Sequence, residues 1–258
     1  MEENPDRFWW KHLFDSLYLV TDARSVLNED VTRREVSFVV DLLSLEPEES
    51  ILDLCGGQGR HAMELGRRGF SRLTVLDYSP HLVKFGDEEC RRQGLPVEFL
   101  RADARRVCLR DETFDAVIVM GNSLCCFLVE EDYLGLLREM HRLLCPGGRF
   151  LLDLPDKKEL VASFLPNSWH EADDDVLVMR ARSWEEPNML VREVVVSKER
   201  GLLKDANYVC RMFGPREIEG LLGRVGFSDI EVIRGFDAQS QDYDLGLMGN
   251  RMLVVGRK

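Results

Sequence analysis

The stretch Ile51-Leu52-Asp53-Leu54-Cys55-Gly56-Gly57-Gln58-Gly59-Arg60-His61 joins a short apolar run to a glycine-rich turn and the start of an amphipathic segment. The apolar run predicts a buried strand, and the glycines allow a tight turn and a close approach of the backbone to a ligand. A helix that begins directly after such a turn presents unpaired N–H groups. The stretch therefore predicts a strand–turn–helix unit that binds the polar part of a small ligand.

Strands and helices alternate after this unit. With helical stretches between them, further strands are predicted at Leu73–Leu76, Val97–Leu100, Ala116–Met120 and Phe150–Leu154. Apolar strands that alternate with amphipathic helices are typical of a parallel sheet covered on both faces. Two closing strands, Asp229–Arg234 and Arg251–Val255, have no helix between them and must pair antiparallel. The sequence predicts an α/β fold with a seven-stranded, mostly parallel, doubly wound (Rossmann-like) sheet and an antiparallel last strand.

The chain is predicted to form a single domain in four parts. An N-terminal helical cap (1–46) precedes the ligand-binding half (47–155), which is followed by an inserted antiparallel layer (156–213) and by the last helix and strand pair (214–258). The length fits one large domain, since domains usually have about 100–200 residues.

The cap and the insert contain local signals of their own. Thr32-Arg33-Arg34-Glu35 has the capping-box pattern, and the apolar residues from Val36 to Leu43 repeat with helical spacing, so a helix is predicted to begin there. Ser79-Pro80 predicts another helix start, with serine as the cap and proline at the first position. In the insert, antiparallel strands are predicted at Asp175–Trp184, Leu190–Lys198 and Ala206–Phe213.

Composition narrows the range of functions. The hydrophobic fraction of 45% and charged fraction of 31% are those of a globular protein, and no apolar run reaches the roughly 18 residues of a membrane span. The N-terminus lacks the pattern of a secretory signal, and the seven cysteines include no C-x-x-C pair, so a reduced, cytoplasmic protein is expected. The net charge of −12 argues against nucleic acid as the main partner.

Three acidic residues follow successive predicted strands or lie at their ends. Asp53 lies on the first strand, Asp77 ends the second, 20 residues beyond Gly57, and Asp103 follows the third. Open α/β sheets bind ligands at the carboxyl ends of their strands. Asp77 is placed to accept hydrogen bonds from the two ribose hydroxyls of a nucleoside, and Asp103 to accept one from an adenine amino group. Together with the glycines, these acids predict a nucleoside site.

These motifs resemble those of class I S-adenosylmethionine-dependent methyltransferases over roughly residues 48–155. Leu52–His61 resembles the first motif, Asp77-Tyr78-Ser79-Pro80 the ribose motif and Asp103-Ala104 the adenine motif, while Phe114–Ser123 resembles the fourth motif. The resemblance implies S-adenosylmethionine as the cofactor and S-adenosylhomocysteine as the product. The cofactor-binding residues it implies are Asp53, Cys55, Gly56, Gly57, Gly59, Asp77, Tyr78, Ser79, Asp103, Ala104, Met120 and Gly121.

Gly121-Asn122-Ser123 is most similar to the corresponding segment of glycine and amino-sugar N-methyltransferases. This resemblance implies transfer to a small-molecule acceptor through an amine nitrogen or an oxygen, with Asn122 beside the acceptor. It also implies that Tyr18, with Arg34 or Arg33, meets the cofactor carboxylate. The N-terminal helices and the inserted layer are expected to form a lid over the site, and His170 is a candidate base for an amine acceptor.

Several alternatives stay open on the sequence. Gly57–Ala62 also fits the dinucleotide fingerprint, so an NAD-dependent oxidoreductase remains, as does a non-catalytic S-adenosylmethionine-binding module. Cys55, Cys125 and Cys126 are read either as apolar filler or as a thiol cluster for a soft acceptor such as arsenite. No resident metal is expected, and the chain is expected to be a monomer or a homodimer.

Overall fold

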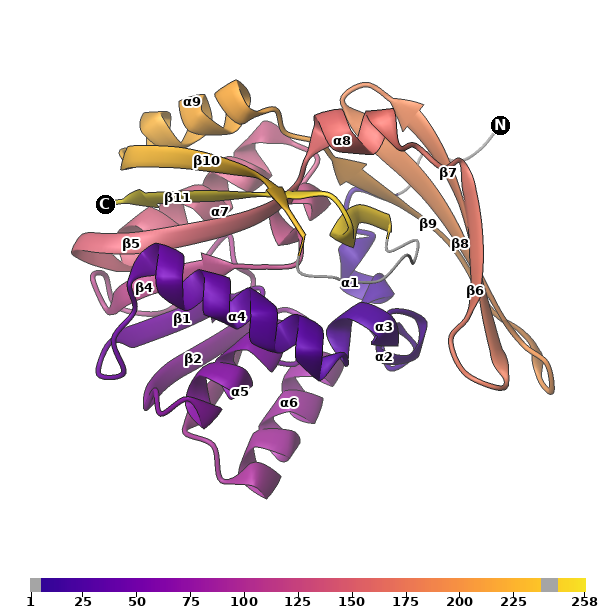
Figure 1. Cartoon of the computed structure of the whole chain (residues 1–258), viewed down its shortest axis with the longest axis horizontal. Helices are drawn as coiled ribbons and strands as arrows, with labels where there is room; N and C mark the ends of the chain where they lie inside the picture. Colours follow the sequence, from indigo (N-terminus) through magenta and orange to yellow (C-terminus); the bar gives the residue numbers. More distant parts are fainter. Residues whose placement is uncertain (1–5, 238–245) are drawn as a thin grey trace.

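A seven-stranded sheet with strand order β10-β11-β5-β4-β1-β2-β3 forms the centre of the structure (Figure 1). The computed structural model describes residues 6–237 and 246–258. The strands of this sheet are β1 (Ser50–Leu54), β2 (Arg72–Asp77), β3 (Val97–Arg101), β4 (Phe114–Val119), β5 (Leu144–Pro155), β10 (Ser228–Phe236) and β11 (Arg251–Arg257). β11 pairs antiparallel with both β5 and β10, whereas β1 to β5 pair parallel. The predicted fold class is confirmed.

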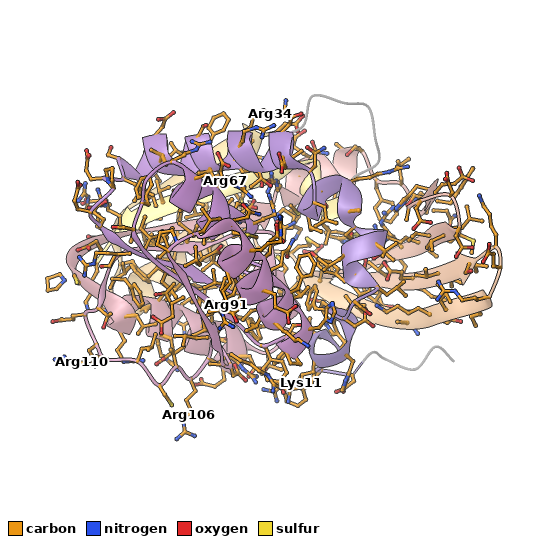
Figure 2. The ribbon with its side chains drawn as sticks, turned by 90° about the horizontal axis from the view of Figure 1, so that it is seen from below. Lys11, Arg34, Arg67, Arg91, Arg106 and Arg110 are labelled. Atoms are coloured by element: carbon orange, nitrogen blue, oxygen red, sulfur yellow. The ribbon has the colours of Figure 1, made fainter. Side chains whose placement is uncertain are left out.

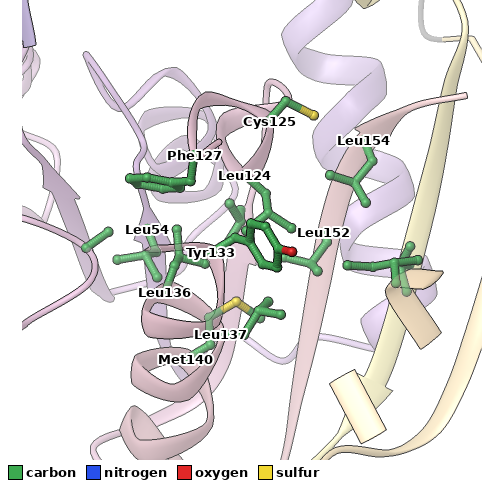
Figure 3. Packing of buried hydrophobic residues seen from close by; sticks show 14 of the residues in the cluster. Leu54, Leu124, Cys125, Phe127, Tyr133, Leu136, Leu137, Met140, Leu152 and Leu154 are labelled. Carbon is green, nitrogen blue, oxygen red and sulfur yellow. The ribbon is translucent and has the colours of Figure 1, made fainter. Parts of the chain in front are cut away.

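Helices cover both faces of this sheet. Val36, Val39 and Leu43 of one helix and Leu65 of the next share a buried cluster with strand residues on one face. On the other face, Leu136, Leu137 and Met140 pack against apolar side chains that include Leu54 and Leu152 (Figure 3). The helices concerned are α4 (Glu29–Leu43) and α5 (Arg60–Arg67) on the first face and α7 (Glu130–Leu143) and α9 (Pro215–Val225) on the second, while α6 (Pro80–Gln93) contacts β2 and β3.

A second, four-stranded antiparallel sheet lies beside the first (Figure 1). Its strands are β6 (Asn167–Glu171), β7 (Val176–Glu185), β8 (Asn188–Ser197) and β9 (Gly201–Arg211), and the short helix α8 (Lys157–Ala162) precedes them. The sequence predicts the last three of these strands but not β6. This strand has only five residues, too few for a clear alternating pattern, and it is specified by its pairing with β7.

Four helices form the N-terminal part. The short helices α1 (Trp10–Leu13), α2 (Tyr18–Thr21) and α3 (Ala23–Val26) precede α4. The capping-box prediction is wrong, because the Asn28 side chain caps α4 by accepting from the N–H groups of Asp30 and Val31. Thr32 and Glu35 therefore lie inside the helix, and both are buried.

Glu35 is the centre of a buried charge network that joins three distant segments. Its Oε1 accepts from Arg251 Nη2 at 2.5 Å, and its Oε2 accepts from Arg60 Nη1 and lies 3.0 Å from His61 Nε2. Arg251 Nη1 also donates to Asp153 Oδ2 at 2.5 Å. Burial opposes ionisation of Glu35, but Arg60 and Arg251 hold its pKa well below the usual range. The network fixes α4 against the glycine-turn helix and the last strand.

Replacing Glu35 with Gln should lower the free energy of unfolding by about 3 kcal/mol or more, because it leaves buried guanidinium groups without their anion. Urea denaturation at pH 7 measures this change. The matched control is Glu29→Gln on the exposed side of the same helix, where the ion pair with Arg33 should contribute less than about 1 kcal/mol. Equal effects of the two substitutions would contradict the central role of Glu35.

Candidate functional site

The glycine turn after β1 has the backbone conformation that its sequence requires. Gly57 and Gly59 have φ angles of 58° and 75°, in the left-handed region that glycine adopts easily. At Gly56, a Cβ atom would lie 2.6 Å from Asp53 Cγ, and at Gly59 it would lie 2.6 Å from Phe99 Cζ. Gly56 therefore lets the turn close over Asp53, and Gly59 lets the first turn of α5 pack against β3.

A cavity of about 150 Å³ opens where this turn meets the carboxyl ends of the neighbouring strands. The short helices α1 to α3 supply one wall, and none of its lining residues comes from β6 to β9. Among the predicted site residues, eleven line it: Tyr18, Cys55, Gly56, Gly57, Asp77, Tyr78, Ser79, Asp103, Ala104, Met120 and Gly121. Eleven of the predicted site residues thus line one cavity, and the inserted layer contacts the N-terminal segment instead of lining that cavity.

Asp77 is held at the cavity wall by two backbone N–H groups. Its Oδ2 accepts from Gly57 N and its Oδ1 from Ser79 N, each at 2.8 Å. Burial raises the pKa of Asp77, while these N–H donors oppose the rise. Each oxygen keeps a free acceptor position, so the carboxylate can receive two hydroxyl groups at once. This geometry fits a ribose diol.

An aromatic wall stands beside Asp103 at another part of the cavity. The ring of Trp10 meets those of Tyr78 and Phe127 edge-on, with centroids 5.0 and 5.7 Å away. Asp103 is held by Arg105, which donates to Oδ1 from Nε at 2.9 Å and to Oδ2 from Nη2 at 2.6 Å. Flat rings beside an acceptor fit a planar base that carries an amino group. Sequence reasoning missed Arg105, although the spacing Asp103-Ala104-Arg105 is visible in the chain.

Asp53 lies beneath the turn and does not line the cavity. Burial raises its pKa to about 7, and neither carboxylate oxygen has a hydrogen-bond partner within the described residues. His61 lies nearby, with Nδ1 3.9 Å from Asp53 Oδ2, and burial lowers its pKa to about 4. His61 does line the cavity, and it is neutral near pH 7.

Besides Asp53 and Gly59, three predicted site residues lie outside the cavity lining. His170 on β6 is outside the cavity lining, where its Nε2 lies 3.1 Å from the carbonyl oxygen of Thr21, so the structure does not place it as a base. Arg34 is also outside the lining, and Figure 2 shows this residue of α4 at the edge of the molecule. Asn122 is buried next to the cavity, and its Nδ2 donates to the carbonyl oxygen of Leu247 at 3.0 Å.

The cavity contains charged residues that the sequence motifs did not single out. Arg60 lines it close to His61, and it is Arg60, rather than Arg34, that presents a guanidinium there. Asp22 lines it from the turn between α2 and α3. Arg60 could have been found from its position directly after Gly59, whereas nothing in the local sequence marks Asp22.

The cysteines divide between the cavity and the core. Cys55 and Cys126 line the cavity, and burial raises the pKa of both thiols well above the usual range. Cys125 lies among apolar side chains (Figure 3). In the described part of the chain, no group of three or more His, Cys, Asp or Glu side chains could hold a metal ion. The arrangement therefore favours the reading of these cysteines as small apolar filler.

Asp53→Asn should stabilise the protein more at pH 8 than at pH 5. The folded-state pKa of Asp53 lies above its unfolded value, so wild-type stability falls as the pH rises from the unfolded value through about 7. The stability gain from the amide should grow by about 2 kcal/mol between the two pH values. Denaturant titrations at both pH values measure it, and an equal gain at both would contradict an uncompensated buried carboxylate.

Comparison with known proteins finds similarity to methyltransferases. Residues 51–148 match the family model described as "Methyltransferase domain". A demethylmenaquinone methyltransferase of Thermus thermophilus is 34% identical over 133 residues, covering 48% of this chain and 59% of that protein. The chain spans little more than half the length of the curated relatives it matches.

Two solved structures share the whole fold. An S-adenosylmethionine-dependent methyltransferase from Clostridium acetobutylicum superposes with a TM-score of 0.74 at 15% identity, covering 93% of this chain and 96% of that one. A SAM-bound amino pentose methyltransferase from Micromonospora echinaspora gives 0.67 at 18% identity, covering 88% and 92%. Residues 51–148 thus match a methyltransferase domain, and the chain shares its fold with solved S-adenosylmethionine-dependent methyltransferases.

Proposed function

We propose that this chain transfers a methyl group from S-adenosylmethionine to a small-molecule acceptor, with an amine nitrogen as the first candidate and an oxygen as the second. The observation that carries the proposal is Asp77, fixed by Gly57 N and Ser79 N with a free acceptor position on each oxygen. It lies in the same cavity as Asp103 and the aromatic wall. These groups fit the ribose and the adenine of the cofactor.

The cavity wall after β4 fits the part of the cofactor that carries the methyl group. Met120 and Gly121 follow β4 at the cavity, and a Cβ at Gly121 would meet open space, so the main chain there is accessible to a ligand. When bound, S-adenosylmethionine supplies an electrophilic sulfonium methyl group. Aligning two reactants in near-attack geometry can contribute about 7–11 kcal/mol. The protein would therefore act mainly by aligning the methyl group with the acceptor and by excluding water from the cavity.

We call the part of the cavity at Met120 and Gly121 its acceptor end, because the methyl acceptor is proposed to bind there. Residues beside these two are proposed to hold this end closed. Asn122 Nδ2 donates to Leu247 O and lies 3.3 Å from Met248 Sδ, and this contact ties the segment 246–248 to the end of β4. Met248 lines the cavity from that segment. Asn122 thus acts as a positioning residue for the cover, and its buried Oδ1 has no hydrogen-bond partner within residues 6–237 and 246–258.

The described part of the cavity lining offers no strongly basic imidazole for an amine acceptor. His61 is the imidazole among its described lining residues, and its pKa of about 4 makes it a weak base. The amine must therefore lose its proton to solvent before it enters.

An amine acceptor is preferred over an oxygen acceptor because of a resemblance in sequence and a similarity in fold to N-methyltransferases. Gly121-Asn122-Ser123 is similar to the corresponding segment of N-methyltransferases, and solved amino pentose and sugar N-methyltransferases share this fold. The name of the Thermus thermophilus relative gives a demethylmenaquinone as its substrate, so relatives differ in acceptor. None of the described helices is long and apolar enough to cross a membrane.

Calorimetric titration of the wild-type protein should show binding of S-adenosylhomocysteine and no binding of NAD. Asp77→Ala should weaken S-adenosylhomocysteine binding at least tenfold, because two charge-assisted hydrogen bonds to the ribose are lost. The matched control is Asp87→Ala on the exposed side of α6, which should leave the affinity unchanged. Binding of NAD alone would establish the oxidoreductase alternative.

A labelled methyl-transfer screen against small amines and hydroxyl compounds tests the acceptor class. For an amine, kcat/KM should rise with pH up to the pKa of the acceptor itself, since the cavity supplies no base near neutrality. A profile that follows an enzyme group near pH 7 with every acceptor would contradict this. Cofactor binding without transfer to any acceptor would favour the non-catalytic binding module.

A further inference from the structure

A buried guanidinium from the second sheet holds a carboxylate at the cavity wall. Arg180 on β7 donates from Nη2 to Asp22 Oδ2 at 2.8 Å, although 158 residues separate the two in sequence. Thr21 Oγ1 donates to the same oxygen at 2.8 Å. Both of these bonds are to Oδ2, no bond to Asp22 Oδ1 is found among the described residues, and Asp22 lines the cavity. The second sheet therefore reaches the cavity through one fixed carboxylate.

Arg180 is itself fixed from the other side. Its Nε donates to Glu193 Oε2 at 2.8 Å, and the Glu193 side chain is buried on β8. Lys204 of β9 lies 3.9 Å from Glu193 Oε1 and donates to the carbonyl oxygen of Leu13 at 3.1 Å. The two anions and two cations balance one another, which is the condition for keeping these charges inside a protein. Asp22 is held in place by a rigid group.

The cavity end near Asp22 carries one group of each charge sign. Arg60 lines the same cavity, and its Nη1 is bound to Glu35 and to Thr32 Oγ1. Tyr18 lines the same cavity as both charges: burial raises the pKa of its hydroxyl, Asp22 adds to the rise, and Arg60 opposes it. A carboxylate and a guanidinium at one cavity end match a zwitterion, whose ammonium and carboxylate each meet the opposite sign.

The other carboxylates are already assigned. Asp77 and Asp103 face the parts of the cavity that fit ribose and adenine, and Asp53 is covered by the turn at Gly56 and does not line the cavity. Asp22 is the acid that remains for a cationic group.

We propose that Asp22 receives the α-ammonium group of the cofactor's amino-acid tail, that Arg60 faces the tail carboxylate, and that Arg180 positions Asp22. The inference rests on the proposed function, because it needs the nucleoside part of the cofactor in the same cavity. In this arrangement the second sheet contributes to cofactor binding through Arg180, which positions Asp22 without touching the ligand.

Asp22→Asn is tested with two probes in calorimetric titrations. S-adenosylhomocysteine carries the amino-acid tail, whereas 5′-methylthioadenosine has the same nucleoside thioether without it. The substitution should weaken S-adenosylhomocysteine binding roughly tenfold, the size of one charge-assisted contact, and leave 5′-methylthioadenosine binding within twofold. Equal loss for both probes, or no loss for either, would overturn the proposal. An acceptor-amine role for Asp22 would leave both affinities unchanged.

Arg180→Lys tests the positioning role. Lysine keeps the positive charge but lacks the planar guanidinium that bonds to both Asp22 and Glu193. The substitution should therefore weaken the binding of S-adenosylhomocysteine but not of 5′-methylthioadenosine, and by a smaller factor than Asp22→Asn does. In the double variant with Asp22→Asn, the loss of affinity for S-adenosylhomocysteine should not exceed that of Asp22→Asn alone. Additive losses would contradict the claim that Arg180 acts through Asp22. The matched control is Asp205→Asn, which breaks an arginine pair on the exposed side of β9 and should change neither affinity.

Two further outcomes separate the proposals from each other. If Asp22→Asn does not fold, Asp22→Glu moves the carboxylate by one methylene and should give the same selective loss, and an equal loss for both probes would overturn the assignment. Failure of the wild-type protein to bind either probe would refute the proposed function itself. Binding of both probes with no tail-specific loss would refute only the role of Asp22.

Discussion

The carboxylate of Glu35 is the constraint on which the site depends. It is fully buried and meets Arg60 at the start of α5, His61 beside it and Arg251 on the last strand. Through Asp153, whose Oδ2 also accepts from Gly121 N at 3.0 Å, the same network extends to the backbone at the acceptor end of the cavity. One buried acid thus fixes the helix that follows the glycine turn and, through Arg251 and Asp153, the backbone at Gly121 after β4. Because an unpaired buried charge is costly, these segments hold their positions together.

The succession of strands along the chain and the position of the cavity at their carboxyl ends could be predicted from sequence because they depend on local patterns. The run Ile51–Leu54 and the glycines after it specify a strand and a turn from neighbouring residues alone, and Asp77 lies at the end of the next such strand. Asp22 and Arg180 form their contact across 158 residues, and no local pattern records that distance. His170 illustrates the opposite error, since its residue type suited a base but its strand lies outside the cavity.

Glu35 shows why a local pattern can mislead. In Thr32-Arg33-Arg34-Glu35 the spacing fits a capping box, yet Asn28 caps the helix four residues earlier. The acid at the last position of the motif serves tertiary ion pairs that involve Arg60 and Arg251 instead. The net charge of −12 can also be read more closely: some of the acidic residues line the cavity, including Asp77, which two backbone N–H groups hold in place.

A crystal structure of the full chain with S-adenosylhomocysteine tests the central claim most directly. The account predicts the ribose hydroxyls on Asp77, the adenine beside Asp103 and Trp10, and the amino-acid tail between Asp22 and Arg60. A ligand bound elsewhere, or bound in this cavity with its ribose away from Asp77, would contradict the account.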